Sequence, residues 1–441
     1  MRPEAFFSEI VATIDQSLVH GERHATSYAA EDTDFIRLNR GKVRQPGHVA
    51  QRYVDIRLIH GMRHVSHALS LSGDLATDSE AVQAAVAALR TVLADVSDDP
   101  HLLLPSTVNS TRTSRGGPLP PSEALVDTIV DAAEGHDLVG FLAAGPVYRG
   151  FANSDGQRNW HEITAFNAQW SLYHRADKAV KAAYSGFAWD DAELRSRMSA
   201  AADQLGVIST PPKSLSPGKY RAYLAPAAMQ EIAQLLSFGG FSARALETQQ
   251  SALAKMRTGM TLDARVHVSE DIAMGVAPAF QSDGFTRPAD VALIDAGALV
   301  GALVSPRTAR EFALSENGAN PWEAPEALSM RGGALATSDA LRALDTGLAV
   351  GNLWYLNYSD RPACRMTGMT RFATFWVENG RIVAPVDVLR FDDTLYRMLG
   401  DNLEALTAER ELLLESNTYG SRLLTSFVLP GALVSEMSFT L

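Results

Sequence analysis

A proline-rich segment near the middle of the chain limits how this sequence can fold. Residues 210–218 read TPPKSLSPG, with prolines at positions 211, 212 and 217. Proline lacks a backbone N–H and fixes φ, so the segment can continue neither a helix nor a central strand. A chain of 441 residues is also longer than one hydrophobic core usually supports. The sequence therefore predicts two domains, residues 1–210 and residues 219–441.

The first part mixes helical and strand-like patterns. Apolar residues at helical spacing predict helices over Pro3–Val19 and Ser79–Val96. A third helix is expected after Pro121, which suits the first turn of a helix. Residues 28–71 and the chain from Leu138 onward favour strands. We therefore expect an N-terminal domain of mixed strands and helices.

The second part is rich in strand signals. A helix is expected from Ala225, followed by a second helix over Phe241–Met256. Strands then dominate, with hairpin turns predicted at Asp295–Gly297 and Glu378–Arg381. The predicted fold class is α+β, with a strand-rich C-terminal domain.

Composition restricts the function classes. The formal charge is −12, from 39 basic and 51 acidic residues, and no run of Lys or Arg resembles a phosphate-binding stripe. The single cysteine, Cys364, rules out an intramolecular disulfide and indicates a reducing compartment. No signal-peptide pattern and no apolar run of about 18 residues is found. We expect a cytoplasmic protein that binds neither nucleic acid nor a membrane.

One His-Glu pair, His161-Glu162, invites comparison with zinc peptidases. Their helix needs a second histidine three or four residues after the glutamate, where this chain has Ala165 and Phe166. The pair also begins a segment with strand-like alternation. Cys364 has no ordered cysteine–histidine signature around it, so a structural thiol is the preferred interpretation over a nucleophile.

Three further histidines lie close together in the sequence. His60, His64 and His67 would share one face of a helix, as a metal site requires. Gly61 and the flanking strand patterns instead favour a hairpin, on which these side chains diverge. The metal site and the exposed turn both stay open at this point, with the turn preferred.

The most specific signal comes from seven short segments in a fixed order. They are EDTDFIRLN at 31–39, SPGKY at 216–220, LSFGGF at 236–241, DGFTR at 283–287, SPRTAR at 305–310, MTGMTR at 366–371 and FWVENG at 375–380. Together they resemble the TldD/PmbA family, in which PmbA is also called TldE. The resemblance covers most of the chain.

The resemblance implies a specific defect in this chain. One branch of the family, TldD, is a zinc peptidase with a His-Glu-x-x-x-His helix and a cysteine near the C-terminus, and the other branch lacks these ligands and pairs with the first. Aligned by order, the helix motif falls on residues 230–235, where Gln230 and Leu235 replace the histidines and only Glu231 remains. The cysteine region falls near Asn417–Ser421, where no thiol exists. No catalytic residue and no metal ligand are therefore expected here.

The resemblance thus implies a metal-free, PmbA/TldE-like subunit of a zinc metalloprotease that acts on unfolded or extended peptides. Zinc is expected in a TldD-like partner, within a heterodimer or higher oligomer, and no cofactor is expected in this chain. Two alternatives stay open: a self-sufficient peptide or small-molecule hydrolase in a biosynthetic pathway, and a non-enzymatic protein-binding modulator, in line with the label "modulator of DNA gyrase" used for this family. The residues predicted to contact substrate or partner are Gly239, Gly240, Thr367, Gly368, Thr370 and Arg371.

Overall fold

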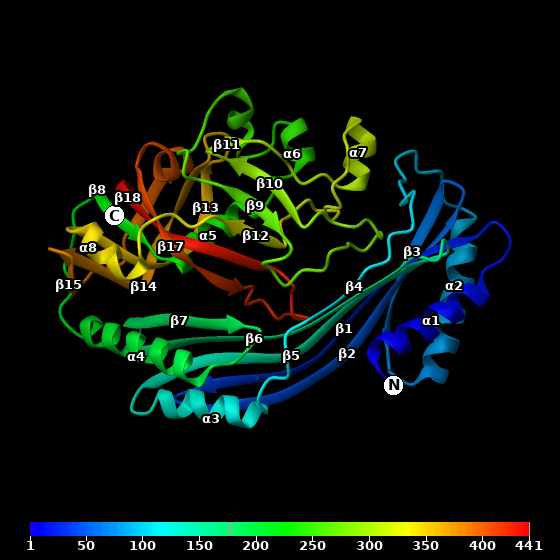
Figure 1. Cartoon of the computed structure of the whole chain (residues 1–441), viewed down its shortest axis with the longest axis horizontal. Coiled ribbons are helices and arrows are strands. Elements are labelled where there is room, and N and C mark those ends of the chain that lie inside the picture. The colour runs from blue at the N-terminus through cyan, green and yellow to red at the C-terminus, as the bar shows by residue number, and fades with distance from the viewer. Residues whose placement is uncertain (176–177, 441) are drawn as a thin grey trace.

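The strands form two sheets in the computed structural model, which describes residues 1–175 and 178–440 (Figure 1). Strands β1 to β7 make the first sheet and strands β8 to β18 the second. The chain passes from one to the other between helix α4 (Asp191–Ile208) and strand β8 (Gly218–Leu224), through the proline-rich segment. The predicted α+β class is confirmed.

The first sheet is a long, bent layer that passes beneath the C-terminal half in Figure 1. Its order is β3-β2-β1-β5-β6-β4, and β7 pairs with β6. All its pairs are antiparallel except β4–β6. The strands are β1 (Arg23–Asn39), β2 (Lys42–His60), β3 (Arg63–Leu71), β4 (Arg112–Arg115), β5 (Asp137–Asn153), β6 (Arg158–Arg175) and β7 (Lys178–Gly186).

Four helices accompany this sheet. The three predicted helices are present as α1 (Pro3–Ser17), α2 (Leu75–Leu93) and α3 (Ser122–Ala132). Helix α4 was not predicted, because its sequence is polar overall. Leu194, Met198 and Leu205 nevertheless form a buried stripe along it, and the Asp190 carboxylate caps its first turn by accepting the Ala192 N–H.

The second sheet contains a closed ring of strands. The ring runs β18-β16-β14-β13-β8, and β8 closes it by pairing with both β13 and β18. The other strands extend from β18 or pair at the side. Beyond β8, the strands are β9 (Val268–Asp271), β10 (Asp290–Asp295), β11 (Ala298–Leu299), β12 (Ala327–Met330), β13 (Gly347–Asp360), β14 (Arg365–Glu378), β15 (Arg381–Pro385), β16 (Arg390–Thr394), β17 (Leu403–Leu414) and β18 (Ser426–Phe439).

The helical segments of this half are short. They are α5 (Pro226–Ser237), α6 (Ala243–Glu247), α7 (Pro306–Phe312), α8 (Ala340–Leu344), and the turns η1 (Ala254–Thr258), η2 (Thr337–Asp339) and η3 (Arg397–Asp401). The prediction of one helix over Phe241–Met256 is wrong. Ser242 caps α6 by accepting the Ala245 N–H, and the chain leaves the helix at Gln249, whose φ is 57°. Only η1 follows, so the apolar spacing across this segment belongs to two short elements joined by a turn.

The two sheets share a hydrophobic cluster. Phe166 of the first sheet, Leu205 of α4, Tyr223 of β8, Phe375 of β14 and Leu433 of β18 are all buried in it. A larger cluster fills the second sheet around α5. Each sheet therefore buries part of its apolar surface against the other. Within the described residues, no helix is long and apolar enough to cross a membrane.

Candidate functional site

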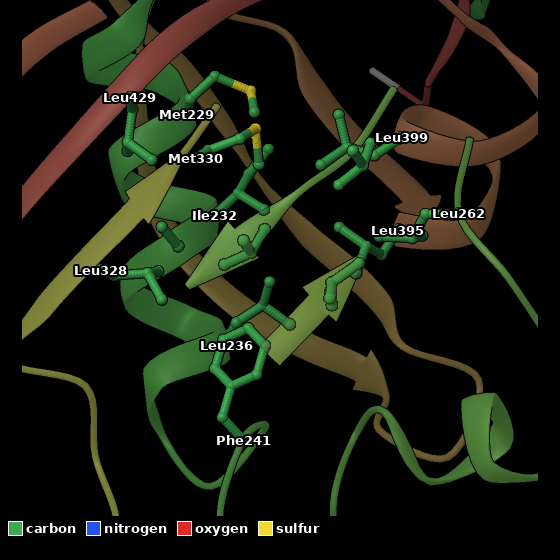
Figure 2. Close-up of a pocket in the computed structure, with 14 residues that line it drawn as sticks. Met229, Ile232, Leu236, Phe241, Leu262, Leu328, Met330, Leu395, Leu399 and Leu429 are labelled. Carbon is green, nitrogen blue, oxygen red and sulfur yellow. The ribbon is translucent and has the colours of Figure 1, made fainter. Parts of the chain in front are cut away.

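Helix α5 occupies the position that the resemblance assigns to a zinc helix. It starts at Pro226, whose missing N–H costs nothing in a first turn, and ends at Ser237. Its inner face is apolar: Met229, Ile232 and Leu236 are buried, and Figure 2 shows them on the side facing Leu395 and Leu399. The cavity on this side measures only about 20 Å³, far below what a ligand needs. The inner face of α5 is core, not a site.

The outer face of α5 carries the residues of the degenerate motif. Gln230, Glu231, Gln234 and Leu235 are all partly exposed, because at 100° per residue they lie opposite the buried stripe. An amide at position 230 and an apolar side chain at position 235 do not fit a zinc site, which needs imidazole, thiolate or carboxylate donors. Within the described residues, no three His, Cys, Asp or Glu side chains are grouped as metal ligands. The side chains of α5 therefore give no route through zinc chemistry.

The outer face of α5 meets the first sheet in a polar cluster. Gln234 Nε2 donates to Glu415 Oε2 at 3.0 Å, just beyond the end of β17. Asn167 Nδ2 of β6 donates to the Glu415 carbonyl at 3.1 Å. Burial raises the pKa of Glu231, the Glu415 charge raises it further, and Lys181 of β7 opposes both. We call Lys181, Glu231, Gln234, Glu415 and Asn167 the inter-sheet cluster. Its amides and carboxylates can hydrogen-bond a peptide backbone.

The β17–β18 loop (residues 415–425), where the family's cysteine would lie, is fixed to the first sheet. The Arg422 guanidinium donates to the carbonyls of Gly145 at 2.9 Å and Ala165 at 3.0 Å. Gln51 Nε2 donates to the Gly420 carbonyl at 2.7 Å. Burial lowers the pKa of Arg422 to about 10. Tyr419 at the loop tip is 96% exposed. Sequence reasoning missed Arg422, since all its partners are distant in the chain.

Gly239 and Gly240 terminate α5. The Gly240 N–H donates to the Leu236 carbonyl at 2.8 Å, and Gly239 has φ 81°. A Cβ at position 240 would lie 2.4 Å from the Leu236 oxygen. The Arg361 guanidinium donates to the Phe238 carbonyl at 2.6 Å and closes the helix end. The geometry thus explains both glycines as helix termination, and their contact with substrate or partner stays a prediction.

The four residues of β14 that were predicted to contact substrate or partner lie on two opposite faces of the strand. Gly368 and Thr370 point inward, and Thr370 Oγ1 accepts the Leu389 N–H at 3.0 Å. Thr367 and Arg371 alternate with them on the outer face, where the Arg371 guanidinium lies 4.1 Å from the centre of the Trp354 ring. The alternation follows from the two-residue period of a strand.

The three neighbouring histidines do not form a metal site in this arrangement. His64 and His67 of β3 are three residues apart, so they point to opposite sides of the sheet, and His60 lies at the β2–β3 turn.

Cys364 and His161 are both held by their surroundings in the fold. Cys364 is buried, and burial raises the pKa of its thiol to about 12, which keeps it protonated and unreactive. His161 heads β6, where its Nδ1 accepts from Thr113 Oγ1 at 2.8 Å and its Nε2 donates to the Val276 carbonyl at 3.1 Å.

His161 makes the fold sensitive to acid. Burial lowers its pKa from 6.5 to about 4, and the hydrogen bond to the Val276 carbonyl opposes this shift only in part. The unfolded chain therefore binds this proton at a higher pH than the folded chain. Stability from His161 is complete above pH 6.5 and is lost as the pH falls toward 4, by up to about 3 kcal/mol. Urea unfolding at pH 7.5 and pH 5 should show a smaller loss in His161→Gln than in the wild type. An equal loss in both would contradict this assignment.

Comparisons with known proteins identify a family for part of the chain and similar folds for all of it. The model of the PmbA/TldA metallopeptidase C-terminal domain matches residues 217–441. No curated protein sequence matches. The fold is similar to TldE from Thermococcus kodakarensis, with a TM-score of 0.78, 14% identity, and 99% of this chain and 100% of that chain covered.

Two further solved structures share the fold. One is a proposed modulator of a DNA gyrase from Thermotoga maritima, with a TM-score of 0.73, 13% identity, and 99% of this chain and 100% of that chain covered. The other is a proposed modulator of DNA gyrase from Bacteroides thetaiotaomicron, with a TM-score of 0.74, 14% identity and both chains covered completely. At these identities the likeness shows the fold alone.

Proposed function

This chain belongs to the PmbA/TldD family, and from that premise we propose that it is a metal-free, TldE-like subunit of a zinc metalloprotease complex. The proposal is supported by the outer face of α5, where Gln230 and Leu235 occupy the positions that the resemblance aligns with the two histidines. Zinc and the cutting step belong to a TldD-like partner. The proposed substrates are unfolded or extended peptides, and the proposed location is the cytoplasm.

The inter-sheet cluster is the proposed contribution of this chain to substrate handling. Gln234 of this cluster, and Gln230 on the same side of α5, offer both donors and acceptors. Such side chains suit the backbone of an extended peptide, which can also add to the edge of a sheet. Gly239, Gly240, Thr367, Gly368, Thr370 and Arg371 stay proposed contact residues, of which only Thr367 and Arg371 lie on the outer face of β14.

The direct test uses the purified chain alone and together with a homologue that carries His-Glu-x-x-x-His. Bound zinc and cleavage of an unstructured peptide are measured for each. We expect zinc and cleavage only when the homologue is present. Stoichiometric zinc or strong cleavage by the isolated chain would overturn the metal-free assignment.

Glu231 provides a sharper test of the same proposal. Its carboxylate has no metal-bound water to activate, so Glu231→Gln should reduce peptide cleavage by the complex by no more than about tenfold, a loss that reflects only its place in the inter-sheet cluster. The matching Glu→Gln change in the homologue's own motif should abolish cleavage. A loss of more than about a hundredfold from Glu231→Gln would assign chemistry to this chain.

The hydrolase alternative predicts that the isolated chain cleaves the peptide without the homologue. It requires a reactive group, and both Cys364 and His161 are buried and held in their neutral forms. The modulator alternative rests on the names of two structural neighbours. Retention of gyrase subunits by the immobilised chain, in the absence of any homologue, would favour it.

A further inference from the structure

The closed ring of the second sheet has an outer face rich in aromatic and arginine side chains. Trp354 of β13, Met369 of β14 and Arg390 of β16 are aligned in register across the three strands, so their side chains share one face. Trp354 is 40% exposed and Tyr355, beside it, is 76% exposed. We define the arginine–aromatic face as Trp354, Tyr355, Met369, Arg371 and Arg390.

Contacts within this face hold it in one arrangement. The Arg371 guanidinium lies over the Trp354 ring at 4.1 Å, and the Trp354 and Tyr355 rings have centres 5.3 Å apart. Arg390 Nε donates to Thr367 Oγ1 at 3.2 Å. Side chains that are already positioned lose little conformational freedom when a partner binds.

The backbone beneath the face is strained. Tyr355 has φ 59° and Phe372 has φ 61°, values that bulky residues rarely adopt. Both residues lie where the β13–β14 register shifts, between Trp354 and Asn357 and beside Arg371. Irregularities of this kind redirect side chains and increase the local twist. Strain of this type concentrates at functional surfaces, and here it accompanies a tyrosine turned to solvent.

The charge of the face is opposite to that of the whole chain. Within the described residues, neither Arg371 nor Arg390 forms an ion pair, and Asp392 of β16 is paired with Arg365. The chain carries a net charge of −12. An exposed cationic and aromatic face therefore fits a partner surface that presents carboxylates around an apolar centre.

We propose that the arginine–aromatic face is the docking surface for the homologous zinc-bearing subunit. The assignment rests on the proposed function, which supplies that partner. Tryptophan, tyrosine, methionine and arginine are the residue types that dominate protein interfaces. Charge complementarity further requires that the partner's facing surface be acidic and that association weaken as salt increases.

The test measures the affinity of the full chain for the purified homologue by titration at two salt concentrations. Trp354→Ala and Tyr355→Ala should each weaken binding at least tenfold. Arg371→Glu should weaken it at least tenfold and reduce its salt dependence, and Arg390→Glu, which leaves the Trp354–Arg371 contact intact, should act in the same direction. Trp322→Ala is the matched control, since Trp322 is 86% exposed elsewhere, and should change affinity less than twofold. Melting temperatures identify any variant that has lost its fold.

The outcomes separate the two proposals. A wild-type chain that does not bind the homologue overturns the partner in the proposed function. A wild-type chain that binds while all four folded variants bind equally well overturns the docking surface alone. Self-association that is lost in Trp354→Ala, without binding to the homologue, would assign the face to a second copy of this chain and overturn the proposal.

Discussion

Replacing Phe166 by alanine is expected to lower the free energy of unfolding by about 3 to 5 kcal/mol. Phe166 is fully buried in the cluster that the two sheets share, with ring centres 4.7 Å from Tyr184 and 4.9 Å from Trp189. The substitution removes transfer free energy and leaves a cavity that surrounding rings cannot fill. Guanidinium unfolding followed by fluorescence and by far-UV circular dichroism measures the change.

The exposed phenylalanine Phe238 is the matched control. It is 71% exposed, so Phe238→Ala should alter stability by less than about 0.5 kcal/mol. Because the cluster joins both sheets, the wild type should unfold in one transition and Phe166→Ala should shift all of it. Two separate transitions, only one of them shifted, would show that the sheets are stable independently.

Replacing Arg422 by methionine is expected to cost about 2 to 4 kcal/mol and to free the β17–β18 loop. The variant removes the Arg422 hydrogen bonds to the carbonyls of Gly145 and Ala165, and a buried polar group that loses its partner costs about 1 to 3 kcal/mol. The Glu31 carboxylate, which accepts the Arg422 N–H at 3.4 Å, also loses a neighbouring positive charge. Limited proteolysis beside Tyr419 should become faster as the loop detaches.

Arg342→Met provides the control for this experiment. The Arg342 side chain is 76% exposed and pairs with Asp339 only three residues away, so its loss should change stability by less than about 0.5 kcal/mol. Unchanged digestion of the loop together with a loss below about 1 kcal/mol in Arg422→Met would show that Arg422 does not hold the loop.

Local signals predicted a large part of the fold. The apolar stripe of α1 (Phe6, Ile10 and Ile14) and the proline at its start are read directly from neighbouring residues. The Asn379-Gly380 turn between β14 and β15 has φ values of 51° and 72°, as the favoured residue types for such a turn require. Helix α4 and the break in the helical segment after Phe241 were not predicted, because the conformation of both segments depends on the residues that pack over them.

For the candidate site, too, the sequence predicted the residues of the motif but not the residues around them. Gln230, Glu231 and Leu235 could be assigned to one helix from order and spacing, and they lie together on α5. Their surroundings could not be read from the sequence. Glu415 lies 181 residues from Gln234 along the chain, and Arg422 contacts a carbonyl 277 residues away. Contacts at such separations depend on chain topology, on which local periodicity carries no information.

The sequence by itself determined the family of the chain, and it predicts that no zinc ligands stand at the family's motif. Residue identity alone decides both, since an amide and a leucine at positions 230 and 235 remain poor ligands in any conformation. Tertiary structure decided what surrounds that motif. It placed Glu231 against Lys181 and Glu415, fixed the β17–β18 loop through Arg422, and closed the ring that turns Trp354 and Arg371 outward. The reason is physical: burial, pKa and exposure depend on which distant strands pack together.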